Sequence, residues 1–197
     1  VRDWKLKYQT EGARQVNTEE VSPYKFINDL SLKIPDFSHI FVDTGCTIAW
    51  MMQSFKNKKN QRIWHDFNNT SMGWALPASI GGVTANADIE SFCITGDGSM
   101  MMNLQELSTI VYNRLKIKII CLNNSGYSMI KQTQDQWMNS DYFASSNEGG
   151  LGFPDFCKVV ESFGIKSLKI TKNEEIKEIL KNFINTKESI FLDVNIT

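Results

Sequence analysis

The sequence predicts an α/β protein, with a three-layer α/β/α arrangement and a mostly parallel sheet. Short apolar runs of strand length alternate with segments whose apolar residues recur at helical spacing. The runs are apolar throughout rather than alternating, which is typical of parallel strands covered on both faces. The 197 residues are enough for one hydrophobic core of ordinary size.

The first twenty residues are polar and contain no apolar signal-peptide region. Because the chain begins at Val1, we expect residues 1–20 to be a linker from an upstream region and residues 21–197 to form the domain. A helix is expected to begin at Ser22-Pro23, with Ser as the cap and Pro in the first turn, and to end before Pro35.

A strand is expected over residues 39–43, passing into a loop at Thr44-Gly45. A second helix should follow, because this stretch is rich in Trp50, Met51, Met52 and Phe55. Residues 56–69 are charged and turn-rich, which predicts a loop. Small residues at close intervals over residues 72–82 suit a helix that approaches a neighbour or a ligand closely.

The second half of the chain continues the alternation. Apolar runs that end in turn residues predict strands over residues 91–95, 117–122, 166–170 and 189–194. Apolar residues at helical spacing predict helices over residues 103–115, 153–163 and 173–184.

Composition excludes some classes of partner. Lys plus Arg number 21 and Asp plus Glu 22, so the net charge of −1 gives no reason to bind nucleic acid or an anionic membrane. No apolar stretch approaches the roughly 20 residues that span a bilayer. The four cysteines show no Cys-x-x-Cys spacing, so we expect reduced thiols and a cytoplasmic location.

Three loops are expected at the carboxyl ends of parallel strands, where α/β sheets bind their ligands: residues 44–47, 96–99 and 123–126. A glycine-rich loop before a helix offers backbone N–H groups to a phosphate. Asp97 and Asn124 add oxygens that suit a divalent cation such as Mg²⁺. A Walker A loop, a Rossmann fingerprint and an EF-hand are all excluded, because their spacings are absent.

A pair of motifs resembles one specific family. Gly96-Asp97-Gly98 is separated by 24 residues, 99–122, from Asn123-Asn124. This spacing resembles the thiamine-diphosphate-binding motif of the thiamine-dependent decarboxylases and acetolactate synthases. The resemblance runs from about Tyr24 to the C-terminus, and it implies the thiamine-diphosphate-binding fold of the diphosphate-binding, C-terminal domain.

Other segments are similar to the acetolactate synthase group in particular. The first cofactor loop of the group resembles the segment with Asp43, Gly45, Trp50 and Gln53, and the second resembles residues 71–78. Residues 126–128 and 132–134 are most similar to synthase homologues found in sugar and cell-surface biosynthesis.

The resemblance implies a role for each matching residue. Mg²⁺ would be held by the Asp97 and Asn124 side chains and the Gly126 carbonyl, with Asp97 in a surface-facing loop. The diphosphate would be contacted by Cys46, Thr47, Gly98, Ser99, Tyr127 and Ser128.

Two further residues would shape the cofactor. Met72 would fill the angle of the bent cofactor and bring its 4′-amino group to the reactive thiazolium carbon. The Thr70 carbonyl would accept a hydrogen bond from that amino group. In the family the activating glutamate lies on a separate pyrimidine-binding domain, so no catalytic residue is expected in this chain.

The sequence departs from the group in two places. Cys46-Thr47 stands where the group has Gln-His, and Thr133 replaces the Trp that selects the second 2-oxoacid in true acetolactate synthases. The resemblance therefore implies the cofactor chemistry rather than the branched-chain substrate choice.

The residues assigned to the cofactor and the metal also have purely structural explanations. Turn formation or core packing could explain Asp97, Asn124, Met72 and Cys46. His39 and His65 have no partner at ligand spacing, so neither is expected to bind metal. Trp137 with Met138 could be core or a lid over the cofactor.

The function expected from the resemblance is that of a diphosphate-binding domain in a thiamine-diphosphate and Mg²⁺-dependent carboligase or decarboxylase. Its substrates would be a 2-oxoacid and a carbonyl acceptor. Its partners would be a pyrimidine-binding domain of the same or another chain and further copies in a homo-oligomer, without nucleic acid or membrane. The alternative is a non-catalytic cofactor-binding or assembly module of the same fold.

Overall fold

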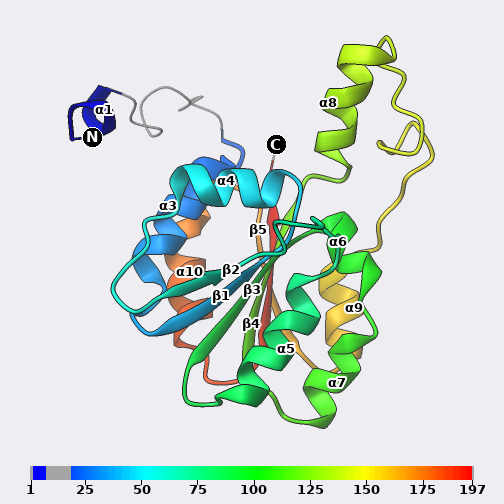
Figure 1. The fold of residues 1–197 in the computed structure, drawn as a ribbon. Helices are drawn as coiled ribbons and strands as arrows, with labels where there is room; N and C mark the ends of the chain where they lie inside the picture. Colours follow the sequence, from blue (N-terminus) through cyan, green and yellow to red (C-terminus); the bar gives the residue numbers. More distant parts are fainter. Residues whose placement is uncertain (1, 8–18, 197) are drawn as a thin grey trace.

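Six parallel strands form one sheet between two layers of helices (Figure 1). The computed structural model describes residues 2–7 and 19–196 of the chain. The strand order is β2-β1-β3-β4-β6-β5. The strands are β1 (Ser38–Val42), β2 (Arg62–Trp64), β3 (Glu90–Gly96), β4 (Ile117–Asn123), β5 (Lys166–Ile170) and β6 (Ile190–Asn195). The expected three-layer α/β/α arrangement is confirmed, and every strand pairing in the described part is parallel.

One face of the sheet is covered by α3 (Pro23–Lys33), α4 (Cys46–Ser54) and α10 (Ile176–Asn185). Helix α3 begins as predicted, with the Lys25 N–H donating to the Ser22 side chain and Pro23 in the first turn. A short 3₁₀ turn, η1 (Asn173–Glu175), leads into α10. Apolar side chains of these helices pack against alternate residues of the central strands, and their burial is the main force that stabilises this layer.

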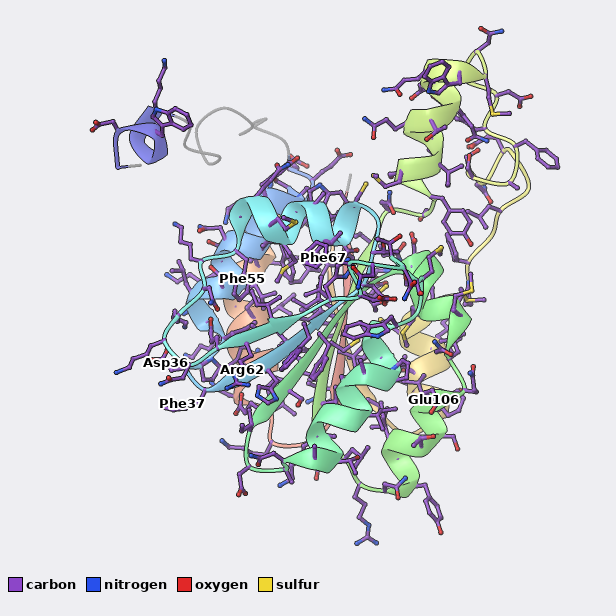
Figure 2. The ribbon with its side chains drawn as sticks, in the orientation of Figure 1. Asp36, Phe37, Phe55, Arg62, Phe67 and Glu106 are labelled. Carbon is purple, nitrogen blue, oxygen red and sulfur yellow. The ribbon has the colours of Figure 1, made fainter. Side chains whose placement is uncertain are left out.

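The other face is covered by α5 (Ala75–Ala85), α6 (Asp97–Met102), α7 (Glu106–Tyr112) and α9 (Phe156–Ser162). Gly82 explains how closely α5 lies on β1, because a Cβ at this position would fall 2.4 Å from the Phe41 ring. Side chains fill the space between the sheet and both helix layers (Figure 2). Cys93 and Cys121 are fully buried free thiols whose pKa burial raises well above the ordinary value, so they act as packing residues.

Three elements differ from the prediction. Strand β2 lies inside the expected loop over residues 56–69 and pairs only with β1 at the sheet edge. The expected helix over residues 103–115 is shortened to α7, because Asn103 leaves the helical conformation and donates from its side chain to the Gly73 carbonyl over 2.5 Å, and α6 precedes it where a loop over residues 96–99 was expected. Helix α8 (Ser128–Trp137) was not predicted, and with the following segment it projects beyond the sheet (Figure 1).

The expected linker over residues 1–20 stays a prediction. Helix α1 (Arg2–Lys7) covers part of it, whereas residues 8–18 lie outside the described ranges. Across residues 2–7 and 19–196, no helix has the length and apolar character that crossing a bilayer requires.

The chain reverses direction across the sheet between β1 and β3. After β1 the connection leads outward to β2, and the next strand, β3, pairs on the opposite side of β1. Parallel sheets bind ligands at such a switch point, outside the carboxyl ends of the strands. The fold therefore places the predicted loops at residues 44–47 and 96–99 side by side at this switch point.

Candidate cofactor site

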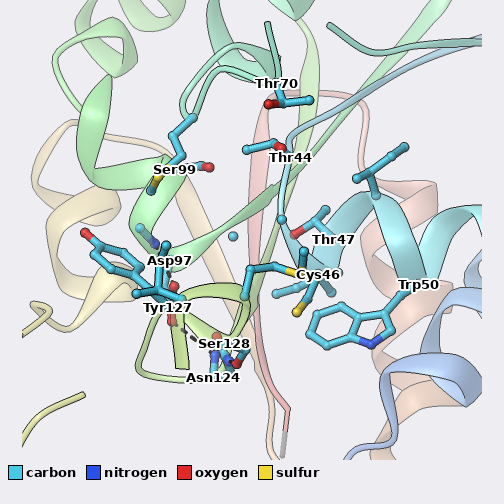
Figure 3. Close-up of a pocket in the computed structure, with 18 of the residues that line it drawn as sticks. Thr44, Cys46, Thr47, Trp50, Thr70, Asp97, Ser99, Asn124, Tyr127 and Ser128 are labelled. Atoms are coloured by element: carbon cyan, nitrogen blue, oxygen red, sulfur yellow. Dashed lines mark hydrogen bonds between the residues drawn. The ribbon is translucent and has the colours of Figure 1, made fainter. Parts of the chain in front are cut away.

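A pocket of about 450 Å³ lies at the carboxyl ends of β1, β3 and β4 (Figure 3). Its volume is in the range usual for cofactor sites. The three predicted loops meet here, joined by the segment before α5. Every residue predicted for the metal or the cofactor lines this pocket: Cys46, Thr47, Thr70, Met72, Asp97, Gly98, Ser99, Asn124, Gly126, Tyr127 and Ser128.

Asp97 joins the loop after β3 to the loop after β4. The Gly98 N–H donates to its Oδ1 over 2.6 Å, and the N–H groups of Asn124 and Gly126 donate to its Oδ2 over 3.1 and 3.2 Å. The expectation of a surface-facing Asp97 is wrong, because only 3 % of the residue is exposed. Burial raises the pKa of this carboxyl, against the opposing effect of the backbone N–H groups of Gly98, Gly126, Asn124 and Ser125.

The Asn124 side chain, the Gly126 carbonyl and the Asp97 carboxylate lie close together. The Asn124 side-chain oxygen lies 3.0 Å from the Gly126 carbonyl oxygen and 3.3 Å from Asp97 Oδ2, and none of these atoms is a donor. Ligands of an octahedral Mg²⁺ at about 2.1 Å stand about 3 Å apart, so this set has the spacing and the hard oxygens that Mg²⁺ prefers. Turned by 180°, the same amide would instead donate to both oxygens.

The oxygen set combines one carboxylate with a side-chain amide and a backbone carbonyl. Within the described residues, no group of three or more His, Cys, Asp or Glu side chains is arranged to hold a metal ion. The amide of Asn124 is further held by a hydrogen bond from its nitrogen to the Ser128 hydroxyl. Ser128 is the first residue of α8, so the candidate metal site is tied to the start of that helix.

Two side chains, Tyr127 and Met72, pack directly against the Gly98 backbone. A Cβ at this position would fall 2.2 Å from the Tyr127 ring and 2.9 Å from the terminal methyl of Met72. The absence of a side chain at position 98 therefore lets both residues approach the backbone. Met72 is 40 % exposed, so it is not the core residue that the purely structural explanation required.

The first turn of α4 supplies another wall. Gly45, with φ of 74°, takes the left-handed conformation that allows β1 to turn into this helix. Thr47 is buried and Cys46 is half-buried, and both face the pocket (Figure 3). Burial raises the pKa of the Cys46 thiol, which keeps it protonated and suits packing as well as ligand contact.

Asp43 holds the segment before α5 in place. This buried carboxylate accepts from the Ala75 N–H over 3.2 Å and from the Thr95 hydroxyl over 2.7 Å. Burial raises the pKa of Asp43, and these hydrogen bonds oppose the rise. Because Ala75 begins α5, the contact fixes the chain just after Met72 relative to the end of β1.

The pocket contains residues that sequence reasoning did not assign to the cofactor: Thr44, Ile48, Trp50, His65, Phe67, Met129 and Ile130. Trp50 belongs to the segment that resembles the first cofactor loop of the acetolactate synthase group, and it lines the pocket. Phe67 lies in the segment after β2, near the carboxyl edge of the sheet (Figure 2). Trp137, which is 81 % exposed, and the exposed Met138 are not core residues, and neither lines this pocket.

Comparison with known proteins decides the family. Residues 43–194 match the model described as "Thiamine pyrophosphate enzyme, C-terminal TPP binding domain". The chain belongs to this family. The family match covers all the candidate loops, and it confirms at family level the expected cofactor, thiamine diphosphate with Mg²⁺.

Relatives of the domain are acetolactate synthase large subunits. The chain is 32% identical over 193 residues to the "Acetolactate synthase large subunit" of Cyanidium caldarium, and 35% identical over 178 residues to the "Probable acetolactate synthase large subunit" of Methanococcus aeolicus. These matches cover 98% and 88% of this chain, but 32% and 29% of the relatives. The domain thus spans about a third of the length of the curated relatives it matches.

Proposed function

We propose that this domain binds the diphosphate end of the cofactor in a thiamine-diphosphate and Mg²⁺-dependent carboligase or decarboxylase that acts on a 2-oxoacid. The observation that carries the proposal is that the Asp97 carboxylate, the Asn124 amide and the Gly126 carbonyl meet at the pocket, where the amide can turn its oxygen towards the other two oxygens around a cation. Their spacing matches adjacent ligands of an octahedral Mg²⁺. The acetolactate synthase relatives support the reaction class.

In this proposal the protein fixes the charged end of the cofactor from two sides. Asp97, Asn124 and the Gly126 carbonyl hold Mg²⁺, which neutralises the diphosphate. The diphosphate itself is contacted by Cys46, Thr47, Gly98, Ser99, Tyr127 and Ser128, all of which line the pocket. Asp97 is suited to this role because its backbone hydrogen bonds keep the carboxylate in one orientation.

The reactive end is shaped by the segment before α5. When bound, thiamine diphosphate supplies an acidic thiazolium carbon and an electron sink for 2-oxoacid chemistry. Met72 is exposed to the pocket and would support the bent form of the cofactor, while the Thr70 carbonyl would accept a hydrogen bond from its amino group. Asp43 keeps this segment in place through the Ala75 N–H.

The proposed partner is a pyrimidine-binding domain, of the same or another chain, that carries the activating glutamate. Exposed apolar side chains near the pocket, such as Met72 and Met129, support the proposal that a partner domain covers this surface. A cytoplasmic homo-oligomer that uses a carbonyl acceptor completes the proposal.

Calorimetric titration of the chain with thiamine diphosphate, with Mg²⁺ and then with EDTA, tests the proposed binding. We expect heat of binding that depends on Mg²⁺ and is lost in Asp97→Asn. Binding that is indifferent to both EDTA and the substitution would overturn the metal assignment. In the complete enzyme, release of CO₂ from a 2-oxoacid separates the catalytic function from a non-catalytic module, which would bind the cofactor without turnover.

A further inference from the structure

His65 lies in the segment between β2 and α5 and lines the pocket together with Thr70 and Met72. The chain contains two histidines, and the other, His39, lies on β1 and is not among the residues that line this pocket. Among the described residues that line this pocket, His65 is therefore the one that carries an imidazole.

Two contacts fix the His65 ring. Its Nδ1 lies 2.8 Å from the Val42 carbonyl oxygen, and the Phe67 ring meets it edge-on with centroids 4.5 Å apart and planes at 86°. A carbonyl oxygen only accepts hydrogen bonds, so Nδ1 carries the proton in this contact. The other nitrogen, Nε2, is then a bare acceptor in the neutral ring.

The Nε2 atom is buried and has no hydrogen-bond partner among the described residues. Buried polar atoms in native proteins are nearly always paired, so an unpaired acceptor beside a pocket needs an explanation. A bound metal ion does not explain the unpaired Nε2, since no cluster of metal-ligating side chains occurs in the described parts of the chain. A ligand that donates a hydrogen bond to Nε2 does explain it.

We propose that Nε2 of His65 accepts a hydrogen bond from an N–H or O–H group of the ligand that fills the pocket. The identity of that ligand rests on the proposed function, which offers two sources. One is an amino group of the cofactor, and the other is a hydroxyl group on the substrate. A simple 2-oxoacid anion such as pyruvate carries no donor, so the second source means a hydroxylated substrate.

Nitrogen NMR of the chain with ¹⁵N-labelled histidine tests this inference, because the spectrum contains the signals of two residues and His39 is the internal control. At a pH where both imidazole rings are neutral, we expect the His65 ring of the free protein to carry its proton on Nδ1 and none on Nε2. A spectrum with the proton on Nε2 overturns the inference at this first step.

Ligand additions then separate the two sources. Thiamine diphosphate and Mg²⁺ are added at millimolar concentration, followed by hydroxypyruvate or, in a parallel sample, by pyruvate. A shift of the His65 Nε2 signal with the cofactor alone assigns the donor to the cofactor. A shift that appears with hydroxypyruvate and not with pyruvate assigns it to the substrate hydroxyl. The His39 signals should not move in either case.

The backbone amide signals of Gly98 and Gly126 report binding in doubly labelled samples. If these amides respond to the cofactor and hydroxypyruvate while the His65 Nε2 signal does not, the inference fails and the proposed function stands. If the amides do not respond either, the proposed function and the inference fail together.

A pair of variants gives an independent measurement. His65→Phe keeps an aromatic ring but removes both the Nε2 acceptor and the Nδ1 contact with Val42, and loss of the hydrogen bond to the ligand should weaken binding about threefold to tenfold. His39→Phe is the matched control and should bind with unchanged affinity. Equal affinity for the wild-type chain and a folded His65→Phe would contradict the inference.

Discussion

The Asp97 carboxylate is subject to two opposing effects, backbone hydrogen bonding and burial. Three backbone N–H groups hold it in one position, which ties the loops after β3 and β4 together. At the same time its burial raises its pKa, so the charged form is less favourable in the free protein than in water. A cation at the neighbouring oxygens would relieve that unfavourable charge, which links the stability of these loops to metal binding.

Substitutions of Asp97 should separate these two roles. Asp97→Ala removes the acceptor of three N–H groups, two of them buried, and should lower the free energy of unfolding by about 1–3 kcal/mol for each buried group. Asp97→Asn keeps one acceptor and should fold with a smaller loss. Both variants should lose Mg²⁺-dependent binding of thiamine diphosphate, measured by calorimetry, and Asn124→Ala should weaken it less. Unchanged affinity in a folded Asp97→Asn would refute the metal role.

Stabilisation by Mg²⁺ should increase with pH. The pKa of Asp97 in the folded chain is raised above its unfolded value, so without metal this group favours the folded state at low pH and disfavours it as pH rises through the folded pKa. Mg²⁺ binds the carboxylate form, so the melting-temperature shift that it produces should shrink as pH falls towards that range.

Melting curves with and without Mg²⁺ from about pH 4 to about pH 8, a range that starts near the ordinary Asp pKa, measure this shift. Asp43 also has a raised pKa, but it is not part of the metal set, so its contribution cancels in the difference. Asp97→Asn is the control and should show no pH-dependent effect of Mg²⁺. A shift that is constant or larger at low pH would contradict the argument.

Helices and strands with buried faces were predictable because burial leaves a pattern in the sequence. Strands β3, β4, β5 and β6 lie within a residue or two of their expected positions, and each is at the centre of the sheet or packed under a helix. Strand β2 was missed because its three residues are exposed and carry no alternation. Helix α8 was missed because most of its residues are exposed, including Met129, Ile130 and Trp137.

The same reasons decide how much of the candidate site could be predicted. The loops after β1, β3 and β4 follow strongly apolar strands and contain glycine, so both the strand end and the turn were visible in the sequence. His65 was not assigned to the pocket, because its position depends on the pairing of β2 with β1. Local sequence carries no signal for that pairing.

The contact between α5 and β1 can be tested with two neighbouring glycines. A Cβ at Gly82 would fall 2.4 Å from the Phe41 ring, whereas a Cβ at Gly81 would meet nothing within 4 Å. Gly82→Ala should therefore lower the free energy of unfolding by about 1–3 kcal/mol, because α5 must move away from the sheet. Gly81→Ala should stabilise the chain by up to about 1 kcal/mol through helix propensity. Chemical denaturation measures both, and similar values for the two variants would show that the close approach is not needed.

At the scale of the whole domain, the described lining of the pocket contains a single carboxylate. Among the described residues that line the pocket, Asp97 is the one acidic side chain, and its carboxylate is engaged by backbone N–H groups. No carboxylate remains there to activate the cofactor. The described lining of the pocket therefore offers oxygen ligands for a cation, and it lacks the second carboxylate that the proposed reaction needs.

The chain alone should accordingly release no CO₂ from pyruvate, even with saturating thiamine diphosphate and Mg²⁺. A coupled assay or a ¹⁴C release assay measures this, with Asp97→Asn as the background control. Release that exceeds the background and disappears in Asp97→Asn would mean that the domain holds its own activating group.

The rim of the pocket predicts how the chain behaves in solution. Phe67, Met72, Met129 and Ile130 line the pocket and are all exposed, which places apolar surface next to a polar binding site. Proteins cover surfaces of this kind with a partner, and in the absence of one they tend to self-associate. We expect the chain to form a dimer or larger assembly, with weak cofactor binding and with the fastest amide exchange over residues 127–152.

Light scattering across a concentration series measures the mass. Ile130→Ser should shift the equilibrium towards monomer, whereas Val111→Ser, which removes an exposed apolar side chain on α7 away from this pocket, should not. A strict monomer at high concentration that binds the cofactor tightly would show that the domain carries a complete binding site by itself.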